Sequence, residues 1–209
     1  HLDFRTWQWR NYSDCGARRA YQWVDLSHSA MLAITDGATT VASHALGPMS
    51  LVLRYSEPVE EAMNGLQEAF VRRGVPCTIF HDDCDREQRW FLPRQDSTMP
   101  QESPDEDLPW GTAFRVIADV DDTNLLWQRL RADLTPEQAE ALGEERCRTG
   151  VAVRFLRDAH VPEGWEPLPT LVVTAADESG LVEALRGLAG ELNQSGYLRL
   201  AAEADLTGA

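Results

Sequence analysis

Short apolar runs alternate with longer helical patterns along this sequence, and this alternation restricts the fold more than any other feature. In the clearest example, the apolar runs 51–53 and 77–80 enclose one helical pattern. That pattern follows Ser56, has Pro58 in its first turn and stops at Gly74. Serine, proline and glycine are preferred at these helix positions. The stretch is therefore predicted to form a strand, a helix and a second strand.

Units of the same kind recur later in the chain. The expected strands are 113–118, 151–155, 171–173 and 197–200, and the expected helices are 125–134, 135–147 and 181–192. Strands that alternate with helices form sheets whose faces the helices cover. The expected fold class is α+β, with one or more mixed sheets and helices on one face. Two ferredoxin-like halves would suit the spacing.

A change in composition divides the chain into two parts. Residues 93–110 combine four prolines with the acidic residues Glu102, Asp105, Glu106 and Asp107. Such a segment is typical of a linker or long loop. The predicted N-terminal α+β half covers 1–92, with an aromatic-rich start and a hairpin at Asp36-Gly37, and the C-terminal α+β half covers 111–209.

The chain is strongly acidic, with 34 Asp and Glu against 19 basic residues and a formal net charge of −15. This charge opposes non-specific binding to nucleic acids and anionic lipids, and it speeds association with basic surfaces. We therefore expect a protein partner with a basic surface, no membrane partner and no direct nucleic-acid binding.

All basic residues are arginines, which excludes a Schiff-base lysine and a P-loop lysine. Codon usage in a GC-rich genome is the simplest explanation for this lysine-free composition, and selection against lysine modification is the alternative.

The cysteine pattern and the hydropathy favour a cytoplasmic protein. The four cysteines lack the close pairs of a zinc ribbon and the density of a disulfide scaffold. No apolar run approaches the roughly 18 residues that a membrane-spanning helix needs. Cys77 lies within an apolar run and is predicted to be a core residue.

Two acidic clusters are candidate metal sites. Asp119 and Asp121 occupy alternate positions at the end of an apolar strand, so their side chains are expected on one side, where they would hold Mg²⁺ or Mn²⁺ against phosphate groups. His81, Asp82 and Asp83 follow another strand and would complete such a site. The structural alternatives are a solvated acidic turn at 81–85 and a helix capped by Asp122 or Thr123.

The N-terminal stretch is a candidate surface for a ligand or a protein partner. Trp7 and Trp9 lie two residues apart among arginines that include Arg5 and Arg10. Aromatic rings and guanidinium groups can stack on planar ligands, and both are enriched at protein interfaces. Core packing of the tryptophans is the structural alternative.

These features favour a non-catalytic intracellular binding or regulatory protein, of the immunity, anti-toxin or adaptor type, that presents an acidic surface to a protein partner. No phosphate loop, nucleophile elbow or zinc-protease helix occurs in the sequence. No cofactor is expected under this hypothesis. The alternative is an enzyme that uses Mg²⁺ or Mn²⁺, held by Asp119 and Asp121, on nucleotides or phosphate esters. A small-molecule sensor and a subunit of a larger assembly are further alternatives.

Overall fold

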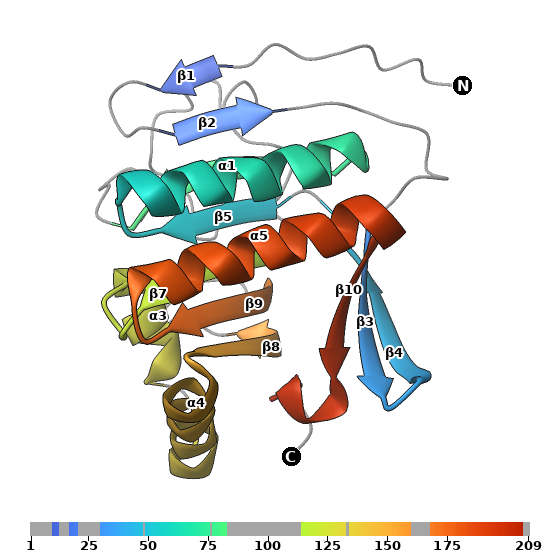
Figure 1. Cartoon of the computed structure of the whole chain (residues 1–209), viewed down its shortest axis with the longest axis vertical. Coiled ribbons are helices and arrows are strands. Elements are labelled where there is room, and N and C mark those ends of the chain that lie inside the picture. Colours follow the sequence, from blue (N-terminus) through green and yellow to red (C-terminus); the bar gives the residue numbers. More distant parts are fainter. Residues whose placement is uncertain are drawn as a thin grey trace, which may run out of the picture.

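Two mixed sheets and four α-helices make up the part of the chain that the structure, a computed structural model, describes (Figure 1). The described residues are 10–12, 17–20, 30–47, 49–75, 77–82, 114–132, 134–159 and 168–206. Within them, no helix is long and apolar enough to cross a membrane.

The larger sheet consists of β1 (Arg10–Tyr12), β2 (Ala17–Ala20), β5 (Met49–Leu53), β6 (Cys77–His81), β7 (Phe114–Val120), β8 (Val151–Ala159) and β9 (Leu168–Ala175). Its strand order is β1-β2-β6-β5-β7-β9-β8. The central strands β6, β5, β7 and β9 are parallel. Antiparallel strands flank them, with β8 beside β9 and β2 beside β6.

The direction of the chain across this sheet changes between β5 and β7. From β5 the chain passes through α1 (Glu57–Arg72) to β6 on one side, and it later enters β7 on the other side of β5. In sheets of this kind, ligands bind outside the carboxyl ends of the strands at such a switch point. A functional site is therefore expected at the carboxyl ends of β5 and β7.

Helices cover both faces of the larger sheet. α1 and α5 (Glu178–Ser195) lie side by side on one face (Figure 1), where they share a core cluster with Leu51. Successive strand residues point to opposite faces. The next residue, Val52, accordingly belongs to a second cluster with α3 (Leu125–Arg131) and α4 (Pro136–Thr149).

The smaller sheet joins distant parts of the chain. It consists of β3 (Met31–Asp36), β4 (Thr39–Ala45) and β10 (Tyr197–Ala201), in the order β10-β3-β4, and the short 3₁₀ helix η2 (Ala202–Ala204) follows β10. β3 and β4 form the predicted hairpin, and β10 pairs parallel with β3.

Local signals explain where the helices begin and end. At the start of α4, the Thr135 hydroxyl accepts a hydrogen bond from the Gln138 amide, and the Gln138 side chain accepts one from the Thr135 amide, which is the predicted capping box. α4 ends at Gly150, whose φ of 81° suits glycine. Ser56 precedes α1 as predicted, but its hydroxyl donates to the Glu178 carboxylate and does not cap the helix.

The structure confirms the expected combination of helices and mixed sheets, with two differences. The helices lie on two faces rather than one, because each face of the central strands carries buried apolar residues, such as Leu51 and Val116 on one and Val52 and Ile117 on the other. Ferredoxin-like halves are not seen in the described residues, since β5 pairs with β7 and β3 pairs with β10. The predicted linker at 93–110 lies outside the described residues. Cys77 is a buried core residue, as predicted.

Candidate functional site

The tight turn after β7 carries the acidic residues that the sequence singled out. Asp121 and Asp122 have φ angles of 49° and 60°, a left-handed conformation that is rare outside glycine and that Asp tolerates better than most residues. The Val120 carbonyl accepts hydrogen bonds from the Thr123 amide at 3.0 Å and the Thr123 hydroxyl at 2.7 Å. Residues in such a conformation persist where neighbouring groups fix them. The contacts of Asp119 and Asp122 do so here.

Asp119 holds the turn from inside the protein. Its side chain is fully buried, and its carboxylate accepts hydrogen bonds from the Asn124 amide at 2.8 Å, the Asp122 amide at 2.9 Å and the Thr174 hydroxyl at 2.7 Å. Burial raises the pKa of this carboxyl, and the three hydrogen bonds oppose that rise only in part. Asp119 therefore fixes the turn and links β7 to β9.

Asp122 connects the same turn to two helices. Its carboxylate accepts from Trp127 Nε1 at 2.9 Å, and it lies 2.9 Å from Arg146 Nη2 and 2.6 Å from Arg131 Nη1. Burial alone would raise the pKa of this carboxyl, but the bonds from Arg146 and Trp127 and the charges of both arginines outweigh burial and lower it. Asp122 is thus an ionised group shared by α3 and α4.

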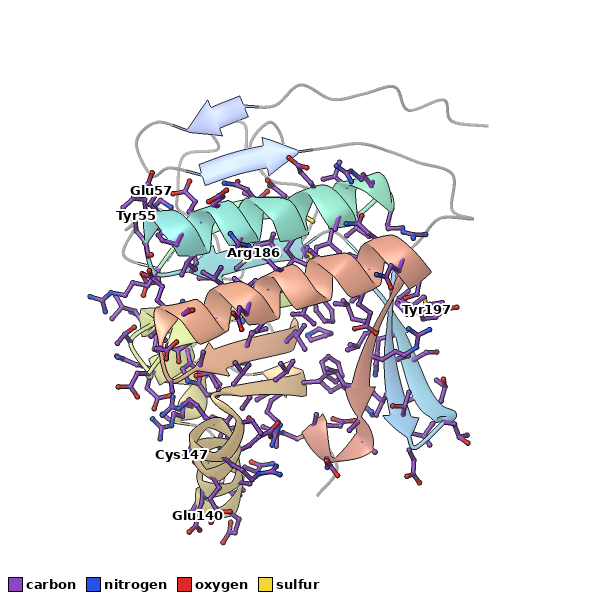
Figure 2. The ribbon with its side chains drawn as sticks, viewed as in Figure 1. Tyr55, Glu57, Glu140, Cys147, Arg186 and Tyr197 are labelled. Atoms are coloured by element: carbon purple, nitrogen blue, oxygen red, sulfur yellow. The ribbon has the colours of Figure 1, made fainter. Side chains whose placement is uncertain are left out.

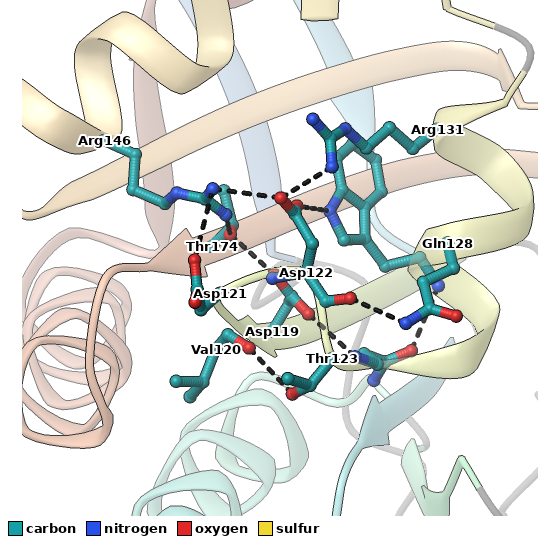
Figure 3. A network of polar contacts seen from close by, with 11 residues as sticks. Asp119, Val120, Asp121, Asp122, Thr123, Gln128, Arg131, Arg146 and Thr174 are labelled. Carbon is teal, nitrogen blue, oxygen red and sulfur yellow. Dashed lines mark hydrogen bonds and ion pairs between the residues drawn. The ribbon is translucent and has the colours of Figure 1, made fainter.

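The Arg146 guanidinium lies where the acidic groups converge (Figure 3). Besides Asp122, it contacts Asp121 Oδ1 at 3.5 Å and donates to Thr174 Oγ1 at 3.2 Å. Its hydrogen bond to Asp122, together with the nearby carboxylates, raises the pKa of Arg146 further, so it remains charged. The carboxylates after β7 therefore surround a cation that the chain itself supplies.

The second acidic cluster divides between two faces of the sheet. Asp82 accepts a hydrogen bond from the Leu125 amide at 2.8 Å, at the start of α3. His81 Nε2 lies 3.7 Å from Glu60 Oε2 on α1. Because adjacent strand residues point in opposite directions, Asp82 lies on the side of Asp119 and His81 does not.

The helix cap expected at Asp122 or Thr123 lies one residue further on. The Asn124 side chain accepts from the Leu126 and Trp127 amides, and Asp82 accepts from the amide before them. The earlier expectation was wrong because Thr123 closes the turn and Asp122 bonds to arginines and Trp127. Asn is as good a capping residue as Asp.

The structure thus brings Asp119, Asp121 and Asp82 to one edge of the sheet, with His81 on the other face. Among the described residues, no group of three His, Cys, Asp or Glu side chains has a geometry that would hold a metal ion. The other predicted site residues cannot be placed: Asp83, Trp7, Trp9 and Arg5 lie outside the described residues, as does the side chain of Arg10 in β1.

Sequence reasoning missed the groups that complete the network, namely Trp127, Arg131, Arg146 and Thr174. The two arginines lie in the last turns of their helices, where basic side chains are common in any protein. Nothing in the neighbouring sequence distinguishes these two arginines from other basic residues at helix ends. Their approach to Asp122 depends on how α3 and α4 pack.

A second polar row crosses the same sheet face near the amino ends of the strands. Thr78, Ser50, Arg115 and Thr170 are neighbours in register on four adjacent strands, and all are buried. Burial lowers the pKa of Arg115 to about 10, so this arginine stays charged at neutral pH. This row lies far along the strands from the Asp119 turn.

Comparison with known proteins gives no family for this chain. No family model matches it, and neither the curated proteins nor the solved structures contain a match. The functional argument therefore depends on the geometry of the described residues.

Proposed function

We propose that this chain is a non-catalytic binding or regulatory protein that presents an acidic surface to a protein partner with a basic surface. The observation that carries the proposal is a contrast between two sets of carboxylates. Those of Asp119 and Asp122 are held by hydrogen bonds within the folded protein, whereas those of Glu137, Glu140 and Glu144 on the outer side of α4 are exposed. The Glu137 carboxylate accepts hydrogen bonds only from the start of its own helix, namely its own amide and the Thr135 hydroxyl. The chain directs its available negative charge outward.

The acidic surface that best supports the proposal is the α4 stripe, which we define as Glu137, Glu140 and Glu144. All three side chains are exposed, and no ion pair of theirs is found within the described part of the chain. Residues three and four apart share one side of a helix, and Figure 2 draws Glu140 pointing away from both sheets. Only Leu142 of α4 is buried, so the helix presents most of its surface to solvent.

The physical role of such a stripe is to attract and orient a partner. Clustered charge of one sign speeds association with a surface of the opposite sign and disfavours partners of the same sign. Its effect declines with salt, because the screening length is about 10 Å at 0.1 M ionic strength. A cytoplasmic protein of the immunity, anti-toxin or adaptor type would use it in this way.

The position of Arg146 weighs against the metal-dependent alternative. A divalent cation between Asp121 and Asp122 would have to displace a guanidinium that already lies 2.9 Å from Asp122. For Asp119 and Asp121 to act as ligands of Mg²⁺ or Mn²⁺ in a phosphate-ester enzyme, the Arg146 side chain would have to leave Asp121, and Asp119 would have to give up hydrogen bonds that it now accepts.

The test removes the charges of the stripe while keeping the helix. The variant Glu137→Gln, Glu140→Gln, Glu144→Gln retains residues of high helix propensity. Tagged wild type is used to capture proteins from cells that contain it, and each captured protein is then purified and its Kd measured over a series of salt concentrations. We expect a basic protein whose Kd rises with salt and rises at least tenfold in the variant.

A matched control carries the same charge change on another helix: Glu57→Gln, Glu61→Gln, Glu68→Gln on α1, where all three are exposed. This control should retain most of the affinity. Binding that is insensitive to salt, or a partner that binds both triple variants as tightly as wild type, would contradict the proposal.

A further inference from the structure

The helix α4 is attached to the rest of the protein mainly by polar contacts. Of its 14 residues only Leu142 is buried, whereas α1 buries eight residues and α5 buries five. Figure 1 draws α4 at the lower margin of the molecule, apart from both of those helices. Most helices in proteins are stabilised by the packing of an apolar face, and an isolated helix of this length is only marginally stable in water. α4 therefore depends on its polar contacts to stay in place.

Polar groups hold α4 near both of its ends. In the first turn, Gln138 Nε2 donates to the Leu206 carbonyl at 2.8 Å. In the last turn, Arg146 Nη2 lies 2.9 Å from the Asp122 carboxylate, and Arg146 also donates to Thr174 Oγ1. A hydrogen bond within the protein replaces one to water, so its net contribution to stability is modest. Gln138 and Arg146 would both bond to water if α4 left the sheet.

The middle of α4 lies against the strand β8. Leu142 packs in the cluster that contains Ala152 and Leu156 of β8, and Glu145 forms an ion pair with Arg154 of the same strand. If α4 left the sheet, the Glu145 carboxylate would enter water, and the Arg154 guanidinium would be uncovered on that side. The apolar surface that opening would expose is therefore small, namely Leu142 and the parts of the two β8 side chains that it covers.

The rest of the structure would keep its own contacts without α4. Asp122 would keep Arg131 Nη1 at 2.6 Å and Trp127 Nε1 at 2.9 Å, both on α3. Removing the partner of a buried charge is strongly destabilising, but here a second arginine remains. The Gly150 carbonyl accepts a hydrogen bond from the Ala176 amide at 2.9 Å, so the chain that follows α4 would stay attached to the end of β9.

We propose that α4 opens as a unit while the two sheets, α1 and α5 stay folded, and that Arg146 is the latch whose contact with Asp122 holds the closed state. Regions with few buried apolar contacts open at a lower free energy than the core. In the open state Asp122 remains with Arg131, and the Arg146 guanidinium is in water. Opening frees the α4 stripe from its fixed orientation, whether or not a basic partner binds that stripe.

Native-state hydrogen exchange at increasing urea concentrations measures this opening. The amides of residues 140–147, inside α4, should exchange at least tenfold faster than the slowest amides of α1 and α5. They should share one opening, which distinguishes a unit from the fraying of helix ends. The urea dependence of that opening should be weaker than that of global unfolding, because less surface is exposed. Exchange of these amides only through global unfolding would overturn the proposal.

Two variants separate the opening of α4 from global unfolding. Val59→Ala weakens the packing of α1, which is folded in both the closed and the open state. It should speed exchange in α1 and α5 and leave α4 unchanged. Arg146→Gln weakens only the closed state, so exchange in α4 should become at least tenfold faster, and the slowest amides of α1 and α5 should change by a similar factor. Exchange in α4 that follows Val59→Ala, or that does not respond to Arg146→Gln, contradicts the proposal.

A matched control and a second latch variant complete the test. Arg148→Gln makes the same charge change at an exposed position of the same turn and should leave exchange as in wild type. An effect as large as that of Arg146→Gln would overturn the role of Arg146. Gln138→Glu keeps the acceptor of the capping box but loses the donor to the Leu206 carbonyl, so it should also speed exchange in α4. Wild-type exchange in Gln138→Glu would contradict a helix that is held at both ends.

Discussion

The pKa values of two aspartates at one turn are shifted in opposite directions by their surroundings. Asp119 is fully buried, and its pKa is raised, whereas Asp122 is paired with Arg131 and Arg146, and its pKa is lowered. Both are supports of the turn, since their oxygens accept hydrogen bonds from the turn, α3 and α4. We therefore expect that the main effect of substitution at either position is a change in the stability of the protein.

Asp119→Asn should lower the free energy of unfolding by about 2–4 kcal/mol. The amide group of asparagine would place a donor against the donors that the carboxylate now accepts, the Asn124 and Asp122 amides. Urea denaturation measures the change. Asp121→Asn is the control, because the Asp121 side chain is 73% exposed, and its effect should stay within about 0.5 kcal/mol. Equal effects at the two positions would contradict the structural role of Asp119.

The lowered pKa of Asp122 predicts a pH-dependent contribution to stability. A carboxyl whose pKa lies lower in the folded than in the unfolded state stabilises the fold above the usual value of 3.8. That contribution is lost as the pH falls through the folded-state pKa. The difference in unfolding free energy between wild type and Asp122→Asn should therefore be constant between about pH 7 and 5 and shrink below about pH 4. Denaturation at several pH values tests this, and a difference that does not change with pH would refute it.

At the scale of a single element, two glycines of the α4 region should respond in opposite ways to alanine. Gly143 lies inside the helix with open space where the alanine methyl group would lie, so Gly143→Ala should stabilise the protein by about 0.5–1 kcal/mol. Gly150 ends the helix with φ of 81°, where a side chain is strained, so Gly150→Ala should destabilise it by about 1–2 kcal/mol. Thermal melting shows whether each substitution raises or lowers the Tm. A Tm change in the same direction for both substitutions would show that the end of α4 differs from the described geometry.

The elements themselves were predictable because their signals are local. Ser56, Gly74 and Thr135 mark helix ends within a few residues of sequence, and the Asp36-Gly37 turn marks a hairpin. Sheet order was not predictable, since the pairing of β7 with β5 depends on which apolar surfaces meet. The candidate site shows the same limit: Asp119 and Asp121 stood out at the end of an apolar run, whereas Arg146 is 24 residues from Asp122 and Thr174 is 55 from Asp119.

For the molecule as a whole, net charge predicts a response to salt. A formal charge of −15 destabilises the compact state through self-repulsion, and added salt screens that repulsion. The Tm should rise by a few degrees between about 0.02 and 0.5 M NaCl. The Gln variant of the α4 stripe, with three fewer charges, should have a higher Tm at low salt and a smaller rise. A Tm that falls with salt would mean that internal ion pairs such as Arg146 with Asp122 outweigh the surface charge.

The parallel pairing of β3 with β10 also constrains how this chain matures during synthesis. Thr35 bonds to the Leu200 carbonyl, 165 residues further along. Before the ribosome has translated β10, the hairpin strand β3 lacks this neighbour. Its apolar side chains Leu32 and Ile34 then have no Leu198 or Leu200 to cover them. Until β10 has emerged, the apolar side chains of the nascent hairpin must therefore be covered by other groups, or the hairpin must remain without stable structure.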